Sequence, residues 1–251
     1  MKRDGLTGRG IEPAPTKRLE KAVCQTLSRV FAICDELADV VTTDLADRSD
    51  AGLIKLQELK SLYASARRTL TAPDSPIYGL GFAVDPKAFA EPGLLWWYSA
   101  PAGQELRPLA VSMQPGHLTY YDYTVSHWWR GSLGDEKPHL FGPYVDHSGT
   151  NAYIVTFSRG VFLHDVQIGM IVGDILVGTL QSLWQRELSA LPKPSSLVDE
   201  DGVVVATNSA RLLGSALRAS SNSAKLAMDG INWKIVVEDS GPSQPTRKKV
   251  A

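Results

Sequence analysis

The sequence has only two cysteines, Cys24 and Cys34, and no Cys-x-x-Cys pair or cysteine–histidine cluster. If the segment that carries them is one helix, they lie roughly 15 Å apart and cannot form a disulfide. The histidines also lack the His-Glu-x-x-His spacing of zinc enzymes. These absences argue against a disulfide-stabilised scaffold and a zinc module, and we expect neither a metal site nor a cofactor.

Long apolar runs and an excess of charge are missing as well. The basic N-terminus has no apolar stretch that resembles a signal peptide. The most apolar window, Val166 to Leu180, is too short to span a bilayer and contains Asp174. We therefore expect no membrane contact and a cytoplasmic location. The formal net charge of −1 gives no reason to expect direct binding of nucleic acid.

Motifs of common enzymes are also absent. The sequence has no Gly-x-Ser-x-Gly elbow and no phosphate-binding Gly-x-x-x-x-Gly-Lys-Ser/Thr loop. Gly79-Leu80-Gly81 lacks the third glycine of a dinucleotide motif. We expect no catalytic residues, and hence a protein that is not an enzyme.

Hydrophobic spacing predicts the helices. Apolar residues at intervals of three and four predict a long amphipathic helix from Lys17 to Val41. The same spacing from Leu53 to Leu70 predicts a second helix, which Pro73 ends. A third helix is expected from Thr179 to Leu191.

Short aromatic or β-branched runs between prolines and glycines predict strands of one sheet. These runs are Tyr78 to Val84, Leu94 to Ser99, Pro108 to Met113, Ala152 to Ser158, Val161 to Phe162 and Gln167 to Ile175. His164-Asp165 is expected to be the turn between the last two, and Tyr120 to Arg130 a short helix or turn. Beyond Ser196, the Asp201-Gly202 turn joins two predicted strands, and a polar helix-like stretch precedes a final strand, Trp233 to Glu238.

The predicted fold class is α+β, with a long N-terminal helix and a second helix packed on an antiparallel sheet, followed by a small β-rich C-terminal unit. We divide the chain into a flexible arm (residues 1–16), a ligand-binding domain with the N-terminal helices (17–191), the small second unit (195–239) and a flexible basic tail (240–251).

Aromatic residues are concentrated between Trp96 and Tyr144, which contain four of the six tryptophans and five of the eight tyrosines. An ordinary core is more simply built from aliphatic residues, because a buried indole or phenol needs a polar partner. We interpret Trp96, Tyr98 and Tyr120 as ordinary packing residues. The functional interpretation of the others is an aromatic box closed by Asp146 or Asp122, which favours a cationic ligand.

Four features resemble, in order and spacing, the Cache domains, which are PAS-like, extracytoplasmic-type sensor modules of chemoreceptors and histidine kinases. They are Trp128-Trp129, Pro143-Tyr144-Val145-Asp146, Gly149-Thr150 followed by Ile154 to Thr156, and Gly169 to Ile175. The predicted N-terminal helix is similar to the helix that packs along such domains. The segment SSLVDEDGVVVATN resembles the opening of a second Cache unit, here truncated. The resemblance covers Lys17 to Asp239.

The resemblance implies a bacterial-type sensor that binds a small molecule. Amine-binding members of the family hold the ammonium group with the aspartate of the Pro-Tyr-x-Asp turn, which is Asp146 here. The implied ligand-binding residues are Tyr121, Tyr123, Trp128, Trp129, Tyr144 and Asp146. Amino-acid-binding relatives carry an arginine at the position of Ser126, so its absence favours an amine or quaternary ammonium compound over an amino-acid-like ligand, unless Arg107 or Arg130 substitutes.

We therefore expect a cytosolic sensor that signals to a partner protein such as a transcription regulator, with a homodimer through the N-terminal helix as an option. Two alternatives remain open. One is an enzyme on the same scaffold, in which Asp146 acts with His147 or His127. The other is a protein-interaction module with a degenerate pocket.

Overall fold

The computed structural model describes residues 13–48, 53–99, 105–217, 224–228 and 231–238. Its helices are α1 (Pro13–Asp44), α2 (Leu62–Leu70), α3 (His127–Gly131) and α4 (Val177–Ser189), with short 3-10 turns η1 (Leu56–Glu58), η2 (Tyr123–Val125) and η3 (Ala210–Leu212). Most of the predicted N-terminal arm and all of the predicted tail (240–251) lie outside the described residues.

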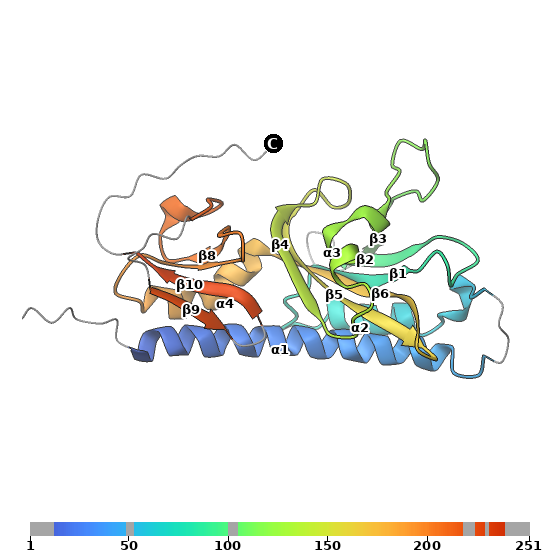
Figure 1. Ribbon diagram of the computed structural model, residues 1–251, viewed down its shortest axis with the longest axis horizontal. Helices are drawn as coiled ribbons and strands as arrows, with labels where there is room; N and C mark the ends of the chain where they lie inside the picture. Colours follow the sequence, from blue (N-terminus) through green and yellow to red (C-terminus); the bar gives the residue numbers. More distant parts are fainter. Residues whose placement is uncertain (1–12, 49–52, 100–104, 218–223, 229–230, 239–251) are drawn as a thin grey trace, which may run out of the picture.

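Two antiparallel sheets follow one another along α1 (Figure 1). The first contains β1 (Gly79–Val84), β2 (Leu94–Ser99), β3 (Leu106–Pro108), β4 (His139–Val145), β5 (Tyr153–Leu163) and β6 (Val166–Leu176) in the order β3-β2-β1-β6-β5-β4. The second contains β7 (Ser195–Val198), β8 (Val204–Thr207), β9 (Ala224–Met228) and β10 (Ile231–Val237) in the order β8-β7-β10-β9. The predicted α+β class with an antiparallel sheet is confirmed.

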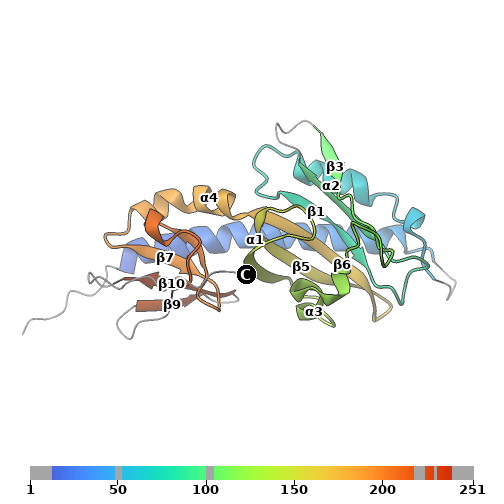
Figure 2. The same cartoon turned by 90° about the horizontal axis from the view of Figure 1, so that it is seen from above.

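Helix α1 forms the base of both units. Its apolar stripe is almost completely buried; it consists of Leu19, Val23, Leu27, Val30, Cys34, Leu37 and Val41. The helix contacts α2, β5 and β6 in the first unit and α4, which runs alongside it, in the second (Figure 2). The stripe therefore packs within its own chain, as amphipathic spacing leads one to expect.

The second helix is shorter than predicted. Residues 53–61 do not join it: Ile54 forms an isolated bridge with Phe89, and only the single 3-10 turn η1 follows. The carboxylate of Glu58 caps the start of η1, since it accepts a hydrogen bond from the backbone N–H of Lys55 at 2.7 Å. It also accepts one from the guanidinium of Arg48 at 2.8 Å. Ile54 and Leu59 are buried, whereas Leu53 is exposed, and tertiary contacts hold this part of the chain in a non-helical segment.

Several strand predictions need correction. Strand β5 is continuous where two runs were expected, and β3 lies at Leu106–Pro108 instead of Pro108 to Met113. Strand β4 was not predicted at all. The expected turn at His164 and Asp165 is confirmed, because both residues have positive φ angles (50° and 63°), as a tight hairpin turn requires.

The second unit also differs from its prediction in one element. The expected polar helix-like stretch contains only the short turn η3 and then strand β9, which pairs with β10. The turn at Gly202, with a φ of 83°, joins β7 to β8 as expected. The indole of Trp184 on α4 donates to Thr26 on α1 at 3.1 Å and packs edge-on against Trp233 of β10. One apolar core thus runs through both units.

Candidate functional site

The two faces of the first sheet carry different residues, because successive side chains of a strand point to opposite faces. On β1, Leu80, Phe82 and Val84 pack towards the helices in one core, whereas Ala83 belongs to an aromatic cluster on the opposite face. That aromatic cluster contains Ala83, Trp96, Tyr123, Trp128, Trp129, Met170 and Val172. A side chain at Gly79 would collide with the ring of Trp96, so the glycine permits this indole to lie close over the sheet.

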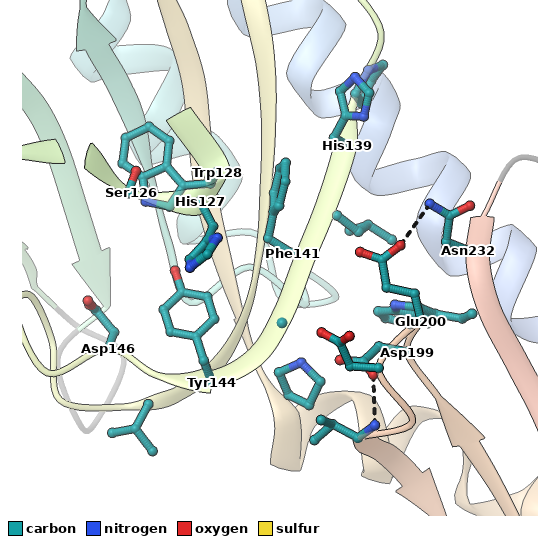
Figure 3. A pocket seen from close by; sticks show the side chains of 18 of the residues that line it. Ser126, His127, Trp128, His139, Phe141, Tyr144, Asp146, Asp199, Glu200 and Asn232 are labelled. Atoms are coloured by element: carbon teal, nitrogen blue, oxygen red, sulfur yellow. Dashed lines mark hydrogen bonds between the residues drawn. The ribbon is translucent and has the colours of Figure 1, made fainter. Parts of the chain in front are cut away.

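A small cavity, which we call the inner cavity, has a volume of about 20 Å³ and lies on this aromatic face. It is lined by Leu94, Trp96, Leu109, Tyr121, Trp128, Tyr144, Asp146, Val172 and Asp174. Tyr121, Trp128, Tyr144 and Asp146 also line a much larger space of about 860 Å³, the outer cleft. The outer cleft lies between β4 of the first unit and the β7–β8 turn and β10 of the second (Figure 3).

Asp174 is the most buried acid of the inner cavity, with 6 % of its surface exposed. It lies directly opposite Thr156 in the β5–β6 pairing, and the Thr156 hydroxyl donates to its carboxyl at 2.7 Å. The Tyr144 hydroxyl lies 2.6 Å from the same Thr156 oxygen. Because a hydroxyl has one proton to donate, Tyr144 is the donor in that second bond. The three side chains form a directed chain of hydrogen bonds that ends on the acid.

Burial raises the pKa of Asp174 to about 8, since the charged form loses its hydration. The Thr156 hydrogen bond opposes this shift, and the nearby carboxylate of Asp146 adds to it. At neutral pH most of Asp174 is therefore protonated. A cation placed beside it would favour the ionised form.

Asp146 is half-buried in the loop after β4. Its Oδ2 accepts the backbone N–H of Thr150 at 2.7 Å and the Thr150 hydroxyl at 3.2 Å. A side chain at Gly149 would collide with this carboxylate, so the glycine allows it to fold over its own loop. Both bonds use Oδ2, and Oδ1 takes no part in closing the loop. The loop thus fixes Asp146 as one wall of the inner cavity.

The phenols of the site stay neutral at physiological pH. Burial raises the pKa of Tyr121 and of Tyr144, and the carboxylates of Asp146 and Asp174 raise both further. The inner cavity thus combines two acids with the uncharged aromatic rings of Trp96, Trp128, Tyr121 and Tyr144. Such surroundings favour a compact organic cation through an ion pair and cation–π contact.

Four of the six predicted ligand-binding residues, Tyr121, Trp128, Tyr144 and Asp146, meet at the inner cavity. The structure places the other two, Tyr123 and Trp129, in the core behind it. The Tyr123 hydroxyl donates to the carbonyl of Val84 at 2.7 Å, and the rings of Tyr123 and Trp129 pack edge-on at 5.1 Å. Neither residue lines the inner cavity or the outer cleft.

Sequence reasoning did not assign Trp96, Thr156 and Asp174 to the site. Trp96 was interpreted as packing, yet it lines the inner cavity while it is 4 % exposed. The available signal for Asp174 was its position as the one charged residue within the apolar run from Val166 to Leu180. An ionisable side chain in a buried stretch of strand is energetically costly unless it has a polar partner or a ligand. Asp174 lies in such a stretch of β6 and lines the inner cavity.

Three other residues considered from the sequence, Ser126, His127 and His147, line the outer cleft but not the inner cavity. Ser126 caps α3: its hydroxyl accepts the N–H of Trp129 at 3.2 Å. Asp122 accepts the N–H of Thr124 at 3.0 Å and caps η2. Arg107 and Arg130 are exposed. Among the described residues, no arginine lines the inner cavity or the outer cleft, and no group of three metal-ligating side chains is present.

Comparison with known proteins identifies the fold. No family model and no curated protein sequence matches the chain. Among solved structures, a protein named Methyl-accepting Chemotaxis protein X matches 89 % of this chain and 94 % of its own, with a TM-score of 0.64 and 12 % identity. The ligand-binding domain of Pseudomonas fluorescens chemoreceptor CtaA in complex with L-valine matches 89 % of this chain and 94 % of its own, with a TM-score of 0.55 and 18 % identity.

A third match is the ligand-binding domain of Campylobacter jejuni chemoreceptor Tlp3 in complex with 4-methylisoleucine, which covers 89 % of this chain and 87 % of its own. Its TM-score is 0.58 and its sequence identity 15 %. The chain therefore has the fold of chemoreceptor ligand-binding domains, and the fold predicted from the resemblance to Cache domains is confirmed. Within the described ranges, no helix has the length and apolar character needed to cross a membrane.

Proposed function

We propose that the chain is a small-molecule sensor domain that binds an amine or a quaternary ammonium compound at the inner cavity and the adjoining part of the outer cleft. The observation that carries this proposal is the pair of acids, Asp146 and Asp174, on one cavity with aromatic walls. Two carboxyl groups in so little space repel each other when both are ionised, and a cation relieves that repulsion. The fold is that of domains whose work is ligand binding, which supports a sensor over an enzyme.

The missing arginine distinguishes an amine from an amino acid. An α-carboxylate is best bound by a guanidinium group, which donates two parallel hydrogen bonds. The described lining of the inner cavity has no basic residue, whereas it has two acids. The CtaA domain is in complex with L-valine, so the test includes amino acids.

The test is a thermal-shift screen of amines, quaternary ammonium compounds, amino acids and carboxylates, followed by calorimetry of the hits. A ligand at about one hundred times its Kd stabilises the fold by about 2.7 kcal/mol. Asp146→Asn should abolish amine binding and leave the fold intact. Asp122→Asn is the matched control, because it removes one carboxylate that caps η2 outside both cavities. Unchanged amine affinity in Asp146→Asn would refute the proposal.

The two alternatives give different results in the same screen. An enzyme would convert the ligand, with Asp146 and His147 or His127 as acid–base groups, and repeated calorimetric injections would show heat of turnover. Asp146 instead hydrogen-bonds Thr150, which favours binding without conversion. An interaction module with a degenerate pocket would show no thermal shift with any compound.

The partner and the location stay predictions. We expect the sensor to act in the cytoplasm on a partner protein such as a transcription regulator, and cell fractionation and pull-down with and without the ligand test both points. A homodimer through α1 would use its outer, polar face, since the apolar stripe is buried. Light scattering with and without the ligand would reveal such a dimer.

A further inference from the structure

The inner cavity and the outer cleft adjoin each other. They share four residues, Tyr121, Trp128, Tyr144 and Asp146. At about 20 Å³, the inner cavity has room for about one water molecule. A cationic head group that reaches Asp174 therefore leaves the rest of its molecule in the outer cleft, whose volume of about 860 Å³ is in the range of small-molecule sites.

The far wall of the outer cleft is acidic. Asp199, Glu200 and Asp201 of the β7–β8 turn line it, and Asn232 of β10 donates to Glu200 at 3.4 Å. In Figure 3 Asp199 and Glu200 lie on the opposite side of the β4 ribbon from Tyr144 and Asp146. Asp199 is 8 % exposed, and burial raises its pKa, so its ionised form would gain from a cation nearby.

Apolar rings also line the outer cleft. Phe31 of α1, Phe141 of β4 and Trp233 of β10 all contribute to the cleft wall. The charged lining of the cleft consists of four carboxyl groups, namely those of Asp146, Asp199, Glu200 and Asp201, against the one ammonium group of Lys137, if its histidines are neutral. An acidic end, an apolar middle and a second acidic end match a molecule that has a cation at each end of a hydrocarbon chain.

We propose that the ligand is such an elongated dication and that it bridges the two units of the chain. One ammonium group lies at Asp146 and Asp174, the hydrocarbon chain crosses the cleft along Phe141, and the second ammonium group lies at the Asp199–Asp201 turn. This inference rests on the proposed amine site and adds the second unit to it. Binding would then fix the two units relative to each other.

Calorimetry with two series of probes tests the inference on the full chain. The first series is α,ω-diaminoalkanes of increasing chain length, and the second is 1-aminoalkanes with the same numbers of carbons. We expect one diamine length to bind about five- to tenfold more tightly than its matched monoamine, because the second ion pair forms within the complex. The double variant Glu200→Gln/Asp201→Asn should remove this preference and leave monoamine affinity within about twofold.

The matched control is Glu91→Gln/Asp165→Asn, which removes two exposed acids that line neither cavity. It should keep the diamine preference. If diamines bind no more tightly than matched monoamines, the ligand ends at the inner cavity and the bridging inference is wrong, while the amine site stands. If neither series binds, the proposed function itself is wrong.

Discussion

The hydroxyl of Thr156 and the carboxyl of Asp174 face each other across the β5–β6 pairing and are joined by a hydrogen bond of 2.7 Å. This one contact does not compensate for the burial of Asp174, whose pKa remains raised to about 8. The chain thus retains an acid that destabilises the folded state whenever it is ionised. Side chains with strongly shifted pKa values cluster at the functional sites of proteins.

Substitution of Asp174 by asparagine should stabilise the protein at alkaline pH. Between about pH 4 and pH 8 the acid is ionised in the unfolded chain and protonated in the folded one, so rising pH favours unfolding by up to about 1.4 kcal/mol per pH unit. Above pH 8 the loss is complete, and below pH 4 it is absent. Asparagine resembles the neutral acid and cannot ionise.

Urea unfolding of both proteins at several pH values measures this effect. The free energy of unfolding of Asp174→Asn relative to the parent should rise as the pH increases from acidic to mildly alkaline values. Asp165→Asn, in the exposed β5–β6 turn, is the control and should show no such trend. A constant difference between Asp174→Asn and the parent at all pH values would contradict the raised pKa.

The main elements of the fold could be predicted because their side chains follow a regular period. Helix α1 and strand β2 match their predictions closely: the helix buries one apolar stripe, and the strand is a short aromatic run. Strand β9 could not be predicted in this way: its sequence, Ala-Lys-Leu-Ala-Met, consists of residues with high helix propensity. Its pairing with β10 outweighs that preference. Strand β4 was missed because Gly142, Pro143 and a register shift interrupt the pattern.

The part of the candidate site that lies within one short stretch of sequence could be predicted. Asp146 and Tyr144 belong to one short motif, so a local resemblance was sufficient to select them. Thr156 and Asp174 meet only because β5 and β6 pair in one register, which the sequence does not reveal by itself. Tyr123 and Trp129 belong to the same aromatic segment as Trp128, but only Trp128 lines the cavity. Aromatic content alone does not distinguish a cavity wall from the core behind it.

Amine binding should release protons from the site. A bound ammonium group lowers the pKa of Asp174, so the complex forms with loss of up to about one proton when the pH is below 8. The apparent affinity should therefore rise from pH 6 towards pH 8. Calorimetry in buffers with different ionisation enthalpies counts the protons directly. Asp174→Asn should bind the same amine with no proton release, and equal release in the variant would assign the proton to another group.

The neighbouring tryptophans should respond differently to substitution. Trp129 is 4 % exposed and packs against Tyr123, so Trp129→Ala should reduce stability by about 3–5 kcal/mol through a cavity in the core. The protein that remains folded should bind the amine with nearly unchanged affinity. Trp128→Leu should instead weaken binding by about 1 kcal/mol, because the ring at the cavity is lost. Calorimetry and urea unfolding of both variants test this, and weaker binding in Trp129→Ala would place that ring at the ligand.

We expect the two units to unfold in one transition. We also expect the side chain of Asn208 to contribute to the stability of the whole chain. Its side-chain amide donates to the carbonyls of Leu188 at 3.1 Å and Lys193 at 2.9 Å, and its oxygen accepts the N–H of Ser195 at 2.7 Å. These bonds fasten the second sheet to the end of α4. Asn208→Ala leaves their partners unsatisfied and should cost about 1–3 kcal/mol.

Because one core runs through both units, this loss should lower the midpoint of a single transition instead of creating a second one. Tryptophan fluorescence and far-ultraviolet circular dichroism, recorded in the same urea series, should give the same midpoint. Asn232→Ala, an exposed position on β10, is the control and should change stability by less than about 0.5 kcal/mol. Separate midpoints for the two signals in Asn208→Ala would show that the second unit unfolds on its own, and the continuous core would then not couple the units.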